Sequence, residues 1–197
     1  MDSSVTPLID ELDANRAMFT ALCRACTLEQ LSRVPPTGRW SVADHVAHVA
    51  SYDQLAILHL AGAAGAAPPD FPNPGLNGDA WNDAEVQRRS GRTVAALQAE
   101  MDALRAAGLA LLTALRAEEL ESDVYFAGDA RRSAGMVPLR LWLRQWSKHD
   151  MLHARVLLRA IPELALHPDF AAWLADDPLL DALERGERAR GASGRRE

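Results

Sequence analysis

Apolar residues recur every three to four positions in four long stretches of the chain, which is the spacing of one buried helix face. These stretches cover residues 7–31, residues 41–62, a third from Ser90 or Thr93 to Ala117, and residues 137–161. The pattern predicts four long helices. Because alanine and leucine dominate and aromatic residues make up only 6% of the chain, helices are favoured over sheet. We therefore expect an all-α fold, a four-helix bundle.

Local signals define where several of these helices begin and end. Ser41 followed by Asp44 forms a capping box, in which each residue bonds a backbone amide of the other. Pro162 ends the fourth helix. Residues 63–79, rich in Gly, Pro and Ala and closed by Trp81 and Asn82, are expected to form a crossover or a lid. Residues 118–136 are expected to form a second irregular connection.

The chain continues beyond the fourth helix. Apolar residues between positions 170 and 183 predict two short helices, separated by Pro178. Residues 186–197 hold no apolar side chain larger than alanine, so we expect a disordered tail. The predicted organisation is a bundle over residues 1–161, a helical extension of the same domain over 162–185, and the tail.

Composition narrows the class of protein. A chain of 197 residues that is 48% hydrophobic suits one domain with a full core, and a formal charge of −6 gives no reason to expect nucleic-acid binding. No apolar run reaches the length of a membrane span, and the acidic N-terminus does not match a signal peptide, so we expect a cytoplasmic protein. Cys23 and Cys26, inside the first predicted helix, are interpreted as buried small residues rather than a redox or zinc pair.

The fourth stretch carries the first candidate chemistry. His149 and His153 are four residues apart, so they lie one turn apart on one helix face, together with Trp142 and Trp146. The basic residues of this stretch gather on another face. Buried imidazoles are costly unless their nitrogens find partners, and a metal ion held by both rings is one such partner.

The second stretch offers three histidines for a third ligand, since His45, His48 and His59 face one way. His59 lies eleven residues beyond His48, about 16 Å along a helix axis, so those two cannot share an ion. Spacing leaves His45 and His48 as rivals. Three neutral imidazoles suit Zn²⁺, Ni²⁺ or Fe²⁺ and leave coordination positions open.

Other residues close to these histidines in sequence are candidates for the pocket. Asp53 and Asp150 could orient an imidazole through a hydrogen bond, and whichever of His45 and His48 is not a ligand could support the site in the same way. Tyr52, Trp142 and Trp146 are candidates for core and pocket wall. The competing interpretation is that every histidine is an ordinary core residue.

Three segments resemble the DinB/YfiT-like superfamily. GRWSVADHVAHVASYD is similar to its second-helix signature, HDMLHARVL to its last-helix HxxxH, and DAWNDAEVQRRSGRTVAAL to its entry into the third helix. The resemblance covers residues 5–161 and implies a metal site of His48, His149 and His153, which decides between His48 and His45. It also implies a four-helix bundle of up-down-down-up topology.

The resemblance implies a class of function as well. Similar proteins include S-transferases and isomerases that use a low-molecular-weight thiol, and others are hydrolases. We therefore expect a divalent-metal-dependent enzyme acting on a small-molecule substrate, with thiol S-transfer first and hydrolysis by metal-bound hydroxide second. The alternative is a metal-binding stress-response protein without turnover. A homodimer is expected by analogy only.

Overall fold

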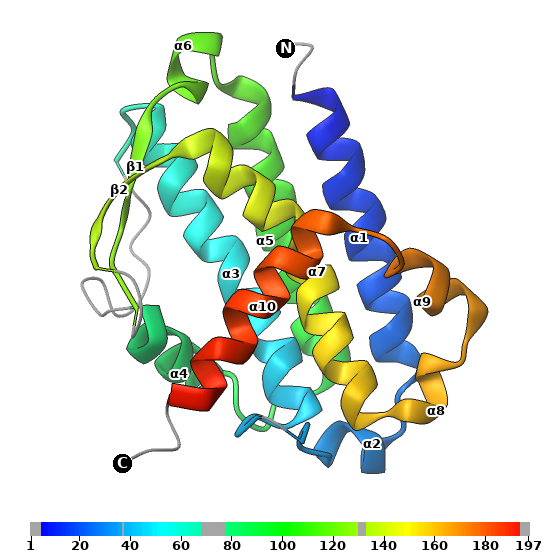
Figure 1. Cartoon of the computed structure of the whole chain (residues 1–197). Helices are drawn as coiled ribbons and strands as arrows, with labels where there is room; N and C mark the ends of the chain where they lie inside the picture. Colours follow the sequence, from blue (N-terminus) through cyan, green and yellow to red (C-terminus); the bar gives the residue numbers. More distant parts are fainter. Residues whose placement is uncertain (1–4, 37, 68–77, 130–132, 194–197) are drawn as a thin grey trace.

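Four long helices dominate the computed structural model, which describes residues 5–36, 38–67, 78–129 and 133–193, with side chains to residue 185. They are α1 (Thr6–Ala25), α3 (Val42–Ala63), α5 (Val94–Ala114) and α7 (Leu139–Ala160). In Figure 1, α1 and α7 run from the top of the view downwards, whereas α3 and α5 run upwards. The all-α class is confirmed, and the exact bundle topology of the superfamily stays a prediction.

The long helices pack around a shared core. Helix α3 contacts both α5 and α7, and α1 contacts α7 and α5 in turn. Their apolar side chains form two clusters along the bundle. One cluster contains Phe19, Val46, Met101 and Leu157, and the other contains Leu12, Leu60, Leu112 and Trp142. The candidate site lies on the contact between α3 and α7.

The first predicted helix ends earlier than expected. Helix α1 stops at Ala25, Cys26 has extended backbone, and a separate helix α2 covers Leu28–Ser32. The physical reason is a capping box at Thr27, whose hydroxyl accepts a bond from the Gln30 amide while the Gln30 side chain accepts from the Thr27 amide. The prediction of one helix over residues 7–31 was therefore wrong over its last part.

The predicted capping box at the start of α3 is confirmed. The Ser41 Oγ accepts a hydrogen bond from the Asp44 amide at 3.2 Å, and the Asp44 carboxylate accepts one from the Ser41 amide at 2.9 Å. This box fixes the first turn of α3. His45 and His48 lie one and two turns into the helix.

The expected long crossover is followed by a helix that the sequence interpretation missed. Helix α4 covers Gly78–Arg88 and packs on α3, while residues 68–77 lie outside the described part of the chain. Its Glu85 is fully buried and accepts bonds from Arg88 and Arg89. A polar helix with little apolar periodicity is stabilised here by buried ion pairs, which explains why the hydrophobic pattern did not predict it.

The second expected irregular connection is also partly ordered. It contains the short helix α6 (Ala117–Leu120) and an antiparallel pair of strands, β1 (Asp123–Phe126) and β2 (Gly135–Pro138), in which Val124 faces Val137. Four-residue strands give too few positions for a periodic signal. The prediction of an irregular segment over 118–136 is corrected accordingly.

The segment after α7 contains the two predicted short helices, α9 (Pro168–Trp173) and α10 (Pro178–Ser193), and a further helix before them, α8 (Pro162–Ala165). Figure 1 shows α10 crossing the bundle, and it contacts α7. Leu180 is fully buried there, and Arg155 of α7 pairs with Asp181. The backbone of α10 continues to Ser193, which differs from the disordered tail expected over residues 186–197.

No helix in the described ranges combines the length and the apolar character that crossing a membrane requires.

Candidate metal centre

Two helices bring three imidazoles together. His48 of α3 and His149 and His153 of α7 each offer a nitrogen, and the three nitrogens all lie within 4.8 Å of one another. All three rings are buried, with exposed fractions between 4% and 7%. The ring centroids of His149 and His153 are 4.5 Å apart, as expected for residues one helical turn apart on one face.

The spacing of these nitrogens is compatible with a common ion. Zn–N bonds of about 2.0–2.1 Å in a tetrahedral site separate two nitrogens by about 3.4 Å. Separations of at most 4.8 Å are closed by small rotations of the three side chains. The donors are three nitrogens with no carboxylate or thiol among them, a set that zinc, nickel and ferrous iron accept.

Burial keeps His48 and His149 uncharged. Loss of hydration lowers the pKa of His48 and of His149 well below the usual value, and a neighbouring histidine lowers each further. A neutral imidazole keeps one nitrogen lone pair, which a metal ion requires. Moreover, the Nδ1 atoms of His48 and His149 are buried without a hydrogen-bond partner among the described residues. Buried polar atoms of this kind call for an explanation, and an ion bound through these two nitrogens would supply one.

Aromatic side chains surround the cluster. Tyr52 stacks on His149, with centroids 3.6 Å apart and planes 10° apart, and Trp142 stacks on Tyr52 at 5.6 Å. Trp40 lies 5.0 Å from His48. Tyr52 and Trp142 thus lie beside the histidines, and their role as a pocket wall stays a prediction, whereas the contact of Trp40 with the histidines was missed. Its position directly before the α3 cap is the signal that could have indicated it.

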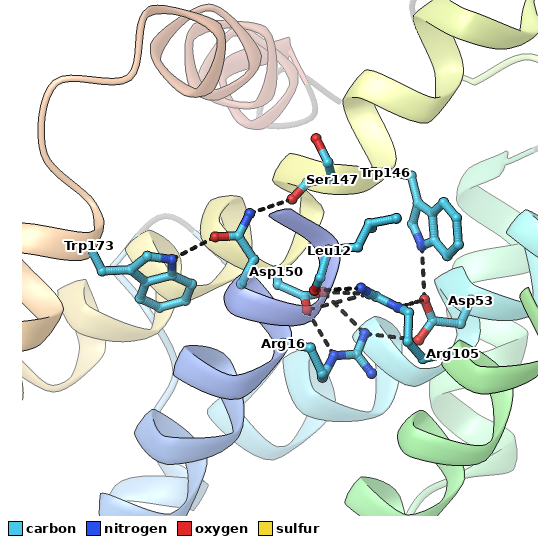
Figure 2. A network of polar contacts seen from close by, with 9 residues as sticks. Leu12, Arg16, Asp53, Arg105, Trp146, Ser147, Asp150 and Trp173 are labelled. Atoms are coloured by element: carbon cyan, nitrogen blue, oxygen red, sulfur yellow. Dashed lines mark hydrogen bonds and ion pairs between the residues drawn. The ribbon is translucent and has the colours of Figure 1, made fainter. Parts of the chain in front are cut away.

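Trp146 and the two carboxylates belong to a buried ionic network instead (Figure 2). Asp53 accepts bonds from Arg16 at 2.8 Å, from Arg105 at 3.1 Å and from the indole of Trp146 at 2.9 Å. Asp150 pairs with Arg16 at 2.8 Å and with Arg105 at 3.4 Å. These side chains are all at most 6% exposed. The described bonds of the carboxylates therefore go to arginines and to one indole rather than to imidazoles.

Arg16 and Arg105 were missed by the sequence interpretation. Both lie on buried stripes, Arg16 between Leu12 and Phe19 on α1, and Arg105 between Met101 and Leu112 on α5. A charged residue at an apolar position of a helix is the signal that could have indicated them, because such a residue needs a buried partner of opposite charge.

The remaining histidines of α3 lie outside the triad. His45 is buried, and its Nδ1 lies 3.0 Å from the Nδ1 of His153. His59 packs edge-on against Trp142, and burial lowers its pKa to about 4. Within the described residues, the group able to hold an ion contains His48 and neither of these two.

The cysteine pair shows no sign of chemistry. Burial raises the pKa of the Cys23 thiol, and it raises the pKa of Cys26 to about 11. The Cys26 thiol donates to the carbonyl of Leu22 at 3.3 Å. Since the thiolate is the nucleophile and the metal ligand, protonated thiols at these positions are inert near neutral pH.

The fold and the site together define a class: a helical protein with a buried three-histidine cluster that could hold a divalent ion. The sequence matches the model of the DinB superfamily over residues 11–157, so the chain belongs to this superfamily. The resemblance read from the motifs is thereby confirmed.

Solved structures and curated proteins complete the comparison. Two crystal structures of mycothiol-dependent maleylpyruvate isomerase, one of a point mutant, are similar to this chain with a TM-score of 0.59 and 15% and 16% sequence identity. The alignment covers 78% of this chain and 60% of each isomerase. A search of curated proteins gave no match. At this identity, the likeness establishes the fold.

Proposed function

We propose that His48, His149 and His153 bind one divalent metal ion and that the protein is a metal-dependent thiol S-transferase. The observation that carries the proposal is the convergence of three buried imidazoles from α3 and α7, two of which, His48 and His149, burial keeps neutral. Nitrogen donors suit Zn²⁺, Ni²⁺ or Fe²⁺, and three protein ligands leave coordination positions open, as in catalytic rather than structural sites.

The charge of the site favours an anionic ligand. Three neutral donors leave the full charge of the ion uncompensated. The carboxylates next to the ligands in sequence, Asp53 and Asp150, already pair with Arg16 and Arg105. When bound, a divalent ion lowers the pKa of a coordinated thiol or water and holds it as thiolate or hydroxide near neutral pH. The histidines therefore present a site suited to a low-molecular-weight thiol.

The neighbouring residues would orient the second reactant. Tyr52 and Trp142 form a stacked aromatic wall against His149, which suits an apolar electrophile. In the transfer, a sulfur–carbon bond forms and the bond to the leaving group breaks, the leaving group departing with its electron pair. The thiol proton goes to solvent. The solved relatives are named as mycothiol-dependent, which supports a cellular thiol as the cosubstrate.

Two other functions remain in competition. Hydrolysis by a metal-bound hydroxide uses the same ligands and needs no thiol. A metal-binding stress-response protein without turnover is favoured by one observation, the burial of every ligand ring at 7% exposure or less, because a closed site retains an ion but restricts substrate access. A small-molecule substrate, the absence of nucleic-acid binding, a homodimer and a cytoplasmic location stay predictions.

A thiol panel separates these functions. Metal-loaded protein is incubated with mycothiol, bacillithiol or glutathione and an aryl chloride electrophile, and thioether formation is followed by absorbance. We expect turnover with at least one thiol, lost on chelation and lost in H48A. H167A, which changes a half-exposed histidine at the start of α9, is the matched control and should keep full activity.

The outcomes assign the function. Metal binding without thioether formation by any thiol contradicts the transferase, and hydrolysis of an activated ester by the same preparation would favour the hydrolase. Activity in H48A equal to that of the unmodified chain contradicts any role of the cluster in catalysis.

A further inference from the structure

A second buried histidine of α3, His45, contacts one ring of the His48, His149 and His153 cluster. The Nδ1 atoms of His45 and His153 are 3.0 Å apart, within hydrogen-bond distance, and both rings are 7% exposed. The two residues are 108 positions apart in sequence, so this contact joins α3 to α7. The sequence pattern left His45 as a rival ligand, and the structure gives it a different position.

Two Nδ1 atoms can share a hydrogen bond only if one carries a proton and the other does not. If His45 were the donor, the proton of a neutral His153 would sit on its Nε2. That nitrogen could not coordinate an ion, and Nδ1 would be occupied by His45. If His153 is the donor, its Nε2 presents a lone pair, which is the form that a metal ligand needs.

We propose that His45 accepts a hydrogen bond from the Nδ1–H of His153 and so fixes the tautomer and orientation in which the Nε2 of His153 faces the metal. This inference rests on the proposed metal site. His45 is a positioning residue: it acts on the ion through His153. Ligand histidines usually donate their second N–H to a carboxylate, a carbonyl or water. A neutral imidazole as acceptor orients the ligand without adding negative charge to the site.

The proposed hydrogen bond lowers the stability of the fold, and a residue with a purely structural role would not do so. With Nδ1 as acceptor, the proton of neutral His45 lies on its Nε2, which is buried without a partner among the described residues. An unsatisfied buried donor lowers stability. The groups around the ring are His153, the Trp40 indole at 5.5 Å, and the charges of Asp44 and Arg159. Replacing His45 by an apolar side chain should therefore weaken metal binding without weakening the fold.

Zinc affinity tests the proposal directly. Apo protein competes with a chromophoric chelator for Zn²⁺, and unfolding temperature is measured in parallel. We expect H45L to bind zinc 10–100-fold more weakly, the usual effect of removing such a partner, with an unfolding temperature equal to or above that of the unmodified chain. In H45N the amide oxygen takes the place of Nδ1 and accepts the same bond, so affinity should return to within about threefold.

A matched control uses the other buried histidine of α3. His59 has a similar exposed fraction, 8%, and touches Trp142 rather than a ligand ring. H59L should keep the zinc affinity of the unmodified chain. In parallel, nitrogen-15 NMR of labelled histidines in the zinc-bound protein should show His153 protonated at Nδ1.

The zinc affinities and the NMR result decide between the proposed role of His45 and its absence. H45L binding zinc as tightly as the unmodified chain, H45N as weak as H45L, or a His153 protonated at Nε2 would overturn the role of His45. These results would leave the proposed metal site intact. Failure of the unmodified chain to bind zinc, nickel or iron would instead overturn the proposed function.

Discussion

At the scale of single residues, burial keeps four histidines neutral: His45, His48, His59 and His149. The pKa of His45 and of His59 falls to about 4, in both cases chiefly because burial removes hydration from the charged ring. Neutral rings are ready to accept a metal ion without first losing a proton. The same property makes the fold sensitive to acid.

His59 provides a measurable case. Its pKa in the folded chain, about 4, lies below the usual 6.5, so the unfolded chain binds more protons between these values. The free energy of unfolding should fall as pH decreases from about 6.5 to about 4. At pH 4.5 the cost from this residue is about 2–3 kcal/mol. Urea unfolding of H59L should show a drop in the free energy of unfolding between pH 7.5 and pH 4.5 that is smaller by about this amount than the drop of the unmodified chain.

Asp53 is the second residue whose effect can be measured. It accepts bonds from Arg16, Arg105 and Trp146 while only 1% exposed. In D53N both arginines lose a charged partner in a buried place, so the free energy of unfolding should decrease by about 3–5 kcal/mol. D83N removes a carboxylate from a more exposed pair, Arg39–Asp83, and should cost less than about 1 kcal/mol. Equal effects of the two changes in denaturant titrations would show that the network contributes no more than a surface pair.

At the scale of elements, the side chain of Trp146 on α7 reaches α5 beside the ionic network. Gly108 of α5 lies opposite Trp146, and a Cβ built at this position would be 3.2 Å from the indole Cη2. The indole is 1% exposed and bonded to Asp53, so it has little freedom to move. A glycine in the middle of a helix is otherwise unfavourable, which indicates that the close approach requires it.

Two glycine substitutions test this packing. G108A gains helix propensity but crowds Trp146, and we expect a net loss of about 1–2 kcal/mol in the free energy of unfolding. Gly62 of α3 has open space around its Cβ position, so G62A should be neutral or stabilise by up to about 1 kcal/mol. Thermal and urea unfolding of both variants check the pair. A G108A protein as stable as G62A would contradict the tight contact.

The sequence predicted those helix ends and residue contacts that depend only on residues close together in the chain. The ends of α3 and α7 follow from a capping box at Ser41 and from Pro162, and the neighbourhood of His149 and His153 follows from their spacing on one helix. The break after Ala25 was equally local, but the Thr27 box was not recognised. Helix α4 was not predicted because buried ion pairs, rather than a periodic apolar face, stabilise it. The β-hairpin was not predicted because its strands are too short to give a periodic pattern.

Contacts between distant segments could not be obtained in the same way. Arg16 pairs with Asp150 across 134 positions and His45 reaches His153 across 108, and a single helix pattern carries no information on its partner helix. The choice of His48 over His45 came from resemblance, because both lie on the same face of α3.

At the scale of the whole molecule, the segment after Pro162 packs as part of the same core. Phe170, Leu174 and Leu180 belong to the cluster that contains Phe19 and Leu157 of the long helices. Ion pairs of Arg155 and Arg159 with Glu184 join α10 to α7. We therefore expect residues 162–185 and the long helices to unfold in one transition.

Leu180 tests this expectation. It is fully buried, so L180A should lower the free energy of unfolding by about 2–5 kcal/mol. Leu166 is 85% exposed, and L166A should change it by less than about 0.5 kcal/mol. Far-ultraviolet circular dichroism and tryptophan fluorescence should give coincident transitions in both proteins. Two separate transitions would show that the C-terminal helices form an independent unit.

The metal content of the purified protein shows whether the three imidazoles hold one ion. Protein produced without a histidine tag and dialysed against metal-free buffer is analysed by inductively coupled plasma mass spectrometry, beside H48A and the control H167A. We expect close to one equivalent of zinc, nickel or iron in the unmodified chain and in H167A, and less than about a tenth of that in H48A. An unmodified chain without divalent metal, even after incubation with excess ion, or an H48A protein as fully loaded as its parent, would contradict the account.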